Sequence, residues 1–336
     1  MQSKTVVAAA LVLFGLPTAS AQTNSQQSAT KNNPSSMKDE NDKSVFRYPK
    51  QFKMINGLTM AYVETGSGDP IIFLHGNPTS SYIWRNIIPY AEPLGRCIAP
   101  DLIGMGDSEK LPSGQAYTFA SNQQFLEGLL DALGVKAKIT FVVHDWGSVL
   151  ALDWARRHPD AVKGIVYMES LIRPRTWEEV PPAAQQIFRS LRSDKGEEMI
   201  LQQNSFIELN LPRTVQRKLS EIEMENYRKP YLVPGEGRQP MLSWARQLPI
   251  GGEPANIVKI VDAYDEWLSQ SRIPKLFIEA NPGTLSKKEK VFCNSLRSQT
   301  HIVLRGSHNL QEDVPDEIGI SISVWLQGIT RDSSSR

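Results

Sequence analysis

The sequence has few residues that could cross-link the chain or bind a metal. Among its 336 residues are two cysteines and five histidines, and none falls in the Cys/His spacing of a zinc site. This composition excludes a disulfide-stapled scaffold and a cysteine-ligated metal centre. Cys97 lies in an expected buried strand, far along the chain from Cys293, so we expect two separate structural thiols.

An excess of charge of one sign is also missing. The 37 basic residues nearly equal the 36 acidic ones, which leaves a formal net charge of +1. Binding to nucleic acid or to an anionic membrane would require a basic patch on the protein. The sequence also has no internal repeat. We therefore expect no nucleic-acid partner, and the composition leaves the oligomeric state open.

Long apolar runs are scarce, and the one at the start of the chain is too short for a membrane span. Val6–Leu16 is apolar, Lys4 precedes it, and Ala19–Ala21 has the small residues of a cleavage site. This pattern is typical of a secretory signal peptide, which we place at residues 1–21. We expect a periplasmic or secreted protein whose mature chain has no membrane span. Residues 22–45 are rich in Gln, Asn, Ser and Lys, which predicts a disordered leader.

The rest of the chain alternates short apolar strands with helical patterns. The turn Asn56-Gly57 indicates a hairpin, and Ile71–Leu74 is one of several expected strands that are followed by loops and helices. This alternation predicts an α/β fold with a doubly wound, mostly parallel sheet, built from residues 46–170 and 250–330. Residues 171–249 break the rhythm with proline-separated helical stretches, which predicts an inserted helical cap.

The segment Lys138–Leu150 carries the strongest functional signal. Ile139–Val143 is an expected buried strand, a helical pattern follows from Val149, and Asp145 lies between them, two residues before Gly147. This is the pattern of a nucleophile elbow with aspartate in place of the usual serine. A carboxylate there would lie at the mouth of the sheet, beside the N–H groups of a helix start.

Two further residues complete a triad at strand ends. Glu169 and His308 each follow an expected strand, so acid and base come after Asp145 in the chain order of α/β-hydrolases. An ionised carboxylate needs no base to attack carbon, whereas the resulting ester needs His308 to activate water, with Glu169 orienting the imidazole. Glu279, at the end of another strand, competes with Glu169 for the role of the acid.

Five motifs occur in order within a span from about Phe52 to Leu326. They are His75–Arg85, Asp101–Gly106, His144–Gly147, Tyr167–Glu169 and Gln311–Asp313. Together they resemble the haloalkane dehalogenase family, and in particular its branch with a catalytic glutamate after the sixth strand. The resemblance implies the α/β-hydrolase fold with its inserted cap.

The resemblance also implies a small halogenated alkane and water as substrates, with no cofactor and no metal. Asp145 would displace the halide, which the side-chain N–H groups of Asn77 and Trp146 would bind. An indole is only a donor and an amide NH2 offers two N–H groups, which suits an anion. The backbone N–H groups of Asn77 and Trp146 would form the oxyanion hole during ester hydrolysis.

The chain departs from the family pattern after the base and in the cap. Asn309 follows His308 where the family usually has phenylalanine, which changes the local packing of the pocket. The cap matches less closely, and its apolar residues serve equally well to line a pocket or to pack the cap. The candidates for pocket lining are Phe188, Phe206, Leu211, Pro240 and Leu242.

Three other functions fit parts of the pattern. Epoxide hydrolases share the fold and the aspartate but need acidic donors such as Tyr227 or Tyr231, and Asn77 favours a halide over an alkoxide. A luciferase-like oxygenase has a similar sequence over the same span, although Pro78 and the expected signal peptide favour the dehalogenase. The third is a binding protein that has the hydrolase fold without its activity, and such a protein would not need a nucleophile, an acid and a base together.

Overall fold

A computed structural model describes residues 42–284 and 287–334 of the chain. The expected signal peptide, residues 1–21, lies outside the described residues, and so does the expected leader up to residue 41. Among the described helices, none is both long and apolar enough to cross a membrane.

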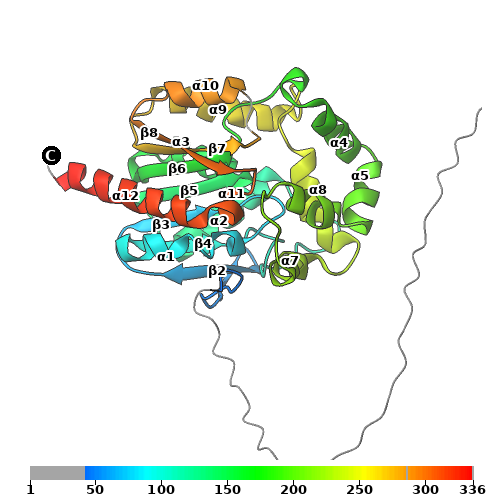
Figure 1. The fold of residues 1–336 in the computed structure, drawn as a ribbon. Coiled ribbons are helices and arrows are strands. Elements are labelled where there is room, and N and C mark those ends of the chain that lie inside the picture. Colours follow the sequence, from blue (N-terminus) through cyan, green and yellow to red (C-terminus); the bar gives the residue numbers. More distant parts are fainter. Residues whose placement is uncertain (1–41, 285–286, 335–336) are drawn as a thin grey trace, which may run out of the picture. The chain divides into compact units, whose positions relative to one another are not determined.

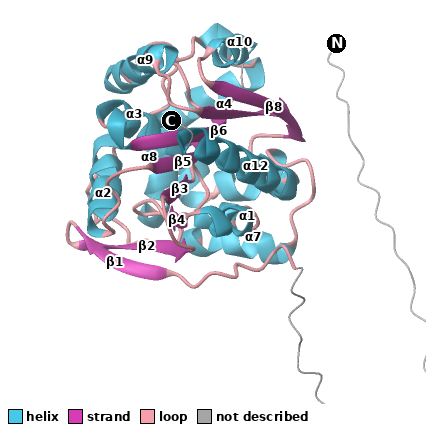
Figure 2. Cartoon of the chain, turned by 90° about the vertical axis from the view of Figure 1, so that its left-hand side faces the viewer, coloured by secondary structure: helices cyan, strands magenta, loops and turns pink. Residues whose placement is uncertain are grey.

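Within the described residues, eight strands form one sheet in the order β1-β2-β4-β3-β5-β6-β7-β8. Figure 2 shows β1 at one edge of this sheet and β8 at the other. β1 and β2 form the hairpin expected around Asn56-Gly57, β2 is also antiparallel to β4, and the remaining neighbours are parallel. The mostly parallel sheet predicted from the sequence is therefore confirmed. The strands are β1 (Gln51–Ile55), β2 (Leu58–Thr65), β3 (Pro70–Leu74), β4 (Arg96–Pro100), β5 (Ile139–Asp145), β6 (Val162–Ser170), β7 (Lys275–Pro282) and β8 (Gln299–Gly306).

Helices cover both faces of the sheet (Figure 1). On one face α2, α3 and α9 share a core with Phe141 of β5, and on the other face α1 and α12 share a core with Val142. Because both faces are buried, the run Phe141–Val143 of β5 is apolar without alternation. The helices are α1 (Ile88–Ala91), α2 (Phe119–Ala132), α3 (Trp146–Arg157), α4 (Pro182–Arg192), α5 (Lys195–Glu197), α6 (Leu211–Arg213), α7 (Glu221–Arg228), α8 (Gln239–Arg246), α9 (Ala255–Gln270), α10 (Lys287–Ser295), α11 (Leu310–Asp313) and α12 (Pro315–Ser334).

The segment 171–249, predicted as a cap, contains α4 to α8 and several short helical turns. Its buried side chains form a third core, which also includes Tyr82 from the turn η1 (Ser81–Trp84). Figure 1 shows α4, α5, α7 and α8 gathered to one side of the sheet. The division between cap and core domains stays a prediction. The short turns there are η4 (Trp177–Glu179), η5 (Glu198–Gln202), η6 (Phe206–Asn210), η7 (Lys229–Tyr231) and η8 (Glu236–Arg238).

The end of the expected leader requires a correction. We predicted disorder up to residue 45, yet Ser44 is buried and its carbonyl accepts a hydrogen bond of 2.6 Å from the Tyr82 hydroxyl. The carbonyl of Lys43 accepts a second one, of 2.7 Å, from Arg85 Nε. Backbone carbonyls make these contacts, so the composition of the segment could not indicate them.

The two cysteines lie in separate parts of the core. Cys97 is in β4 and Cys293 is in α10, and their side chains are 1% and 0% exposed. Burial raises the pKa of the Cys97 thiol to about 12, which keeps it protonated at neutral pH.

Candidate active site

The structure brings Asp145, Glu169 and His308 together beyond the carboxyl ends of the parallel strands. Asp145 ends β5, Glu169 lies near the end of β6, and His308 comes two residues after β8. His308 Nδ1 lies 3.2 Å from Glu169 Oε2, and His308 Nε2 lies 3.9 Å from Asp145 Oδ1. The imidazole thus lies between the two carboxylates. This is the arrangement expected for a base that is oriented by Glu169 and acts beside Asp145.

Asp145 occupies a sharp turn between β5 and α3. Its φ of 47° and ψ of −126° are rare for a residue with a Cβ. Close backbone approach explains the neighbouring glycine: a Cβ on Gly147 would collide with the carbonyl oxygen of Leu74 and lie 2.6 Å from that of His75. The strand-to-helix turn of a nucleophile elbow is present, and it presents the carboxylate at the start of the twelve-residue helix α3.

Backbone N–H groups contact this carboxylate. The N–H of Asn77 donates to Asp145 Oδ2 at 2.7 Å, and the N–H of Trp146 also donates to Asp145. These two groups are placed as an oxyanion hole requires, since the ester of Asp145 would keep one oxygen between them.

The side chains of Asn77 and Trp146 contact helix α8 of the cap. Asn77 Nδ2 donates to the carbonyl of Met241 at 3.0 Å, which uses one of its two N–H bonds. The Trp146 ring lies against that of Trp244, with ring centroids 4.4 Å apart. Among the described residues, the indole N–H of Trp146 has no hydrogen-bond acceptor. One amide N–H and one indole N–H therefore stay available for an anion.

The buried site shifts two pKa values in the same direction. Burial raises the pKa of Asp145, and the nearby His308 and the N–H groups of Asn77 and Trp146 only partly offset it. Burial would lower the pKa of His308, but the hydrogen bond to Glu169 and the charges of Asp145 and Glu169 outweigh this effect and raise it. The protonated imidazole is therefore stabilised, as a general base needs after it has taken a proton.

Glu279, the competing acid, has other partners. Its carboxylate lies 2.8 Å from Lys290 Nζ and 3.0 Å from His301 Nε2. Glu169 rather than Glu279 contacts His308. Sequence reasoning missed Thr284, whose N–H and hydroxyl both donate to Glu169, because a hydroxyl in a loop belongs to no motif.

His144 lies beside His308, the candidate base, but is a poorer candidate for that role. Its Nε2 is 2.8 Å from the carbonyl oxygen of His308, and the two rings lie 4.7 Å apart. Burial and then the adjacent His308 lower the pKa of His144 well below its usual value. A neutral ring in this position holds the backbone of the catalytic loop.

The predicted pocket residues all belong to the cap, and most of them are buried in it. Phe188 is partly exposed, and the buried ones are Phe206, Leu211, Pro240 and Leu242. Their role in lining a pocket stays a prediction, since packing the cap accounts for their burial equally well.

Asn309 forms hydrogen bonds at a position where the family usually has an apolar residue. It is buried, its Nδ2 donates to Thr214 Oγ1 at 2.7 Å, and its N–H donates to the Thr214 carbonyl at 2.9 Å. A polar link thus joins the loop of His308 to the cap where the family usually has an aromatic ring.

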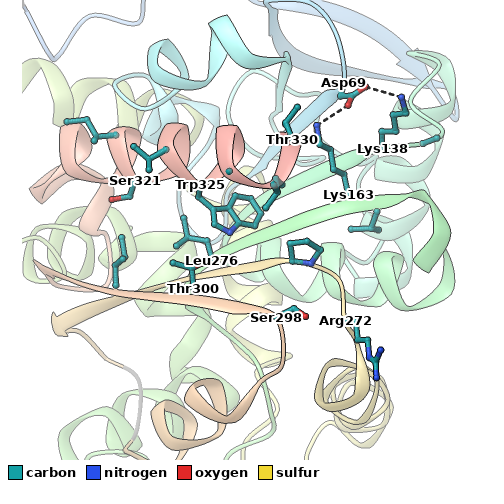
Figure 3. Close-up of a pocket in the computed structure, with 18 of the residues that line it drawn as sticks. Asp69, Lys138, Lys163, Arg272, Leu276, Ser298, Thr300, Ser321, Trp325 and Thr330 are labelled. Atoms are coloured by element: carbon teal, nitrogen blue, oxygen red, sulfur yellow. Dashed lines mark hydrogen bonds and ion pairs between the residues drawn. The ribbon is translucent and has the colours of Figure 1, made fainter. Parts of the chain in front are cut away.

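A large open hollow of about 1190 Å³ lies elsewhere, at the amino ends of the strands and beside α12 (Figure 3). Three of its charged residues are paired, since Asp69 lies 3.0 Å from Lys163 Nζ and 4.0 Å from Lys138 Nζ. None of the predicted site residues lines it, so it is not the site of the chemistry.

The fold and the turn at Asp145 indicate the class of protein to which the chain belongs. A protein-family model described as alpha/beta hydrolase fold matches residues 69–226. This match agrees with the sheet, with the turn at Asp145 and with the chain order of nucleophile, acid and base.

Comparison with known proteins then gives the family. The chain is 52% identical to a haloalkane dehalogenase of Sphingobium indicum, over 83% of this chain and 95% of the relative, and 48% identical to one of Mycolicibacterium smegmatis, over 83% and 91%. The crystal structure of haloalkane dehalogenase DbeA from Bradyrhizobium elkani USDA94 superposes with a TM-score of 0.81 at 41% identity, over 84% of this chain and 99% of that one. The chain belongs to the haloalkane dehalogenase family, which confirms the resemblance inferred from its motifs.

Proposed function

We propose that this enzyme hydrolyses the carbon–halogen bond of small alkyl halides to an alcohol, a halide ion and a proton. The observation that carries the proposal is the ionisable carboxylate of Asp145, placed between two sets of N–H donors and the imidazole of His308. Family membership supports the same reaction.

In the first step, an oxygen of Asp145 attacks the carbon that bears the halogen. Oδ2 is held by the Asn77 N–H, whereas Oδ1 faces His308, so Oδ1 is the attacking atom. The new C–O bond forms as the C–X bond breaks, and the electron pair leaves with the halide. The remaining side-chain N–H groups of Asn77 and Trp146 bind that halide.

In the second step, His308 takes a proton from water, which attacks the carbonyl carbon of the Asp145 ester. The backbone N–H groups of Asn77 and Trp146 stabilise the oxyanion. As it collapses, the C–O bond to the alkyl group breaks, the leaving oxygen takes the proton back from His308 to give the alcohol, and Asp145 is restored when its carboxyl group loses a proton to solvent. Glu169 stabilises the imidazolium while it holds the proton. Apart from the alkyl halide and water, every group used in these two steps is a residue of the chain.

The cap tyrosines do not favour the epoxide hydrolase alternative. The hydroxyl of Tyr227 donates to Glu312, and Tyr231 is buried beneath Lys110, whose Nζ lies 4.5 Å from the centre of its ring. The hydroxyl of Tyr227 is therefore already used. The hydroxyl of Tyr231 has no hydrogen-bond partner among the described residues, but the charges that act on it are those of Asp101 and Tyr117 and not that of Asp145. No observation favours the oxygenase or the binding protein.

We also propose that the protein is exported, on the strength of the signal-like residues 1–21. N-terminal sequencing of the mature protein tests this proposal, because cleavage after Ala21 predicts a chain that starts at Gln22.

The two-step mechanism predicts a trapped intermediate in His308→Ala. This variant should release about one equivalent of bromide from a short bromoalkane and then stall as the Asp145 ester, because only the second step needs the base. Bromide assays with intact-mass spectrometry measure both events, and Asp145→Ala is the control that should give neither. The mechanism is wrong if His308→Ala carries no alkyl adduct.

A further inference from the structure

The dipeptide Gly283-Thr284, in the loop after β7, encloses the carboxylate of Glu169. The N–H of Thr284 donates to both carboxylate oxygens, at 3.1 Å to Oε1 and 3.0 Å to Oε2, and its hydroxyl also donates to Oε2. Glycine is required beforehand, because its φ is +57° and a Cβ would lie 2.6 Å from Glu169 Oε1. The loop therefore holds the acid with neutral donors.

The same loop also contacts the base. The Thr284 hydroxyl oxygen lies 3.4 Å from His308 Nδ1, which itself lies 3.2 Å from Glu169 Oε2. The hydroxyl of Thr284 and the Nδ1–H of His308 thus share one carboxylate oxygen. In addition, the N–H of Gly283 donates at 3.1 Å to the carbonyl of Gly306, two residues before His308.

We propose that Thr284 is a positioning residue for ester hydrolysis: its hydroxyl fixes Glu169 Oε2 and moderates the stabilisation that the acid gives to protonated His308. The inference rests on the proposed function, in which only the second step uses His308 as a base. Among the described residues, the side chain and N–H of Thr284 contact Glu169 and His308, and they make no hydrogen bond to Asp145, Asn77 or Trp146, which carry the first step.

Loss of the Thr284 hydroxyl should favour the protonated form of His308. With one donor fewer, Glu169 Oε2 interacts more strongly with the Nδ1–H of His308, which favours the protonated imidazole. The other charged or titratable groups that act on His308 are Asp145, His144 and Arg175, and the substitution changes none of them. Because the base must be neutral to take a proton from water, the acid limb of ester hydrolysis should move to higher pH.

The experiment compares Thr284→Val with Thr284→Ser in single turnovers of a short bromoalkane, from about pH 5 to 9. Valine keeps the shape and the backbone N–H but removes the hydroxyl, whereas serine keeps the hydroxyl. Quenched-flow mass spectrometry follows decay of the alkyl ester, and a halide assay follows the bromide burst. In the valine variant we expect decay slower by roughly three- to tenfold at its optimum, with an acid limb roughly 0.3–1 pH unit higher. The bromide burst should be unchanged, and the serine variant should match the parent.

Two results would overturn the role of Thr284. One is an ester decay and an acid limb in the valine variant equal to those of the parent. The other is a slower bromide burst with an unmoved acid limb, which a merely structural residue would give. If the parent protein releases no bromide at all, the proposed function itself is refuted, and the role of Thr284 with it.

Discussion

Asp145 combines two features that each oppose folding. A residue with a Cβ in a rare backbone conformation costs about 1–3 kcal/mol, and Asp145 has a φ of 47°. Its carboxylate is also buried, which raises its pKa because the charged form loses water. The surrounding strand, helix and N–H donors hold the residue in this state, where a more stable arrangement would withdraw it from the substrate.

Asp145→Asn should therefore make the protein more stable at about pH 9. Since the folded state raises the pKa of Asp145, it binds this proton more tightly than the unfolded chain, and stability is lost as pH rises from the usual value of 3.8 through the raised one. Asparagine carries no charge and avoids that loss. Thermal unfolding should show a melting temperature a few degrees higher at pH 9, with a smaller gain near pH 4. A lower melting temperature at pH 9 would contradict this account.

At the residue scale, position in the fold decided what could be predicted. Asp145, Glu169 and His308 each follow an apolar strand, and parallel strands end at one edge of a sheet, so the sequence indicated their proximity. The choice between Glu169 and Glu279 needed the structure, because both residues fit that rule. Thr284 was missed since its role depends on a loop geometry that leaves no pattern in sequence.

The first turn of helix α3 lies in close contact with the backbone at the end of strand β3. Gly147 lies in the first turn of α3, where the backbone of Leu74 and His75 leaves no room for a side chain. By contrast, Gly328 lies in α12 and a Cβ there would meet nothing within 4 Å. Close backbone approach thus explains the glycine at position 147 but not the one at position 328.

Gly147→Ala and Gly328→Ala form a matched pair. Alanine at position 328 should stabilise the protein by about 0.5–1 kcal/mol, because it is the better helix former. Alanine at position 147 must displace backbone and should destabilise it by more than about 3 kcal/mol, or prevent folding. Urea unfolding of both variants measures the difference. Equal effects at the two positions would mean that close approach at the elbow does not explain Gly147.

Elements with a clear period were easier to predict than the cap. The hairpin, the parallel strands and α2 follow from alternation or helical spacing, and the structure contains them. The cap instead consists of short helices and turns, several of only three to five residues, which are too brief to set a period. The anchoring of Ser44 was unpredictable for another reason, since it depends on backbone carbonyls.

Across the whole molecule, a buried ionic network ties the cap to the loop of the base. Arg85 contacts Glu312 at 2.6 Å and Glu223 of α7 at 2.9 Å, and Arg217 contacts Glu312 at 2.6 Å. The hydroxyl of Tyr227 also donates to Glu312, four residues after His308. Movement of the cap helix α7 therefore requires separation of buried charges.

Glu312→Gln should destabilise the protein by about 3 kcal/mol, because it leaves Arg85 buried without its full counter-charge. Glu221→Gln is the control, since Glu221 pairs with Arg228 at the surface with its side chain 71% exposed, and such a pair contributes less than about 1 kcal/mol. Urea unfolding separates the two variants. If Glu221→Gln lowers the free energy of unfolding as much as Glu312→Gln does, burial does not explain how much the network contributes to stability.

Because Cys97 and Cys293 are buried, the enzyme is suited to site-specific labelling with a spectroscopic reporter. With both native thiols shielded from solvent, a maleimide dye would react with a cysteine introduced at Leu209 or Val233 of the cap, which are 51% and 76% exposed. A dye attached there could follow the opening of the cap during turnover, with no native cysteine removed and the residues around Asp145 untouched.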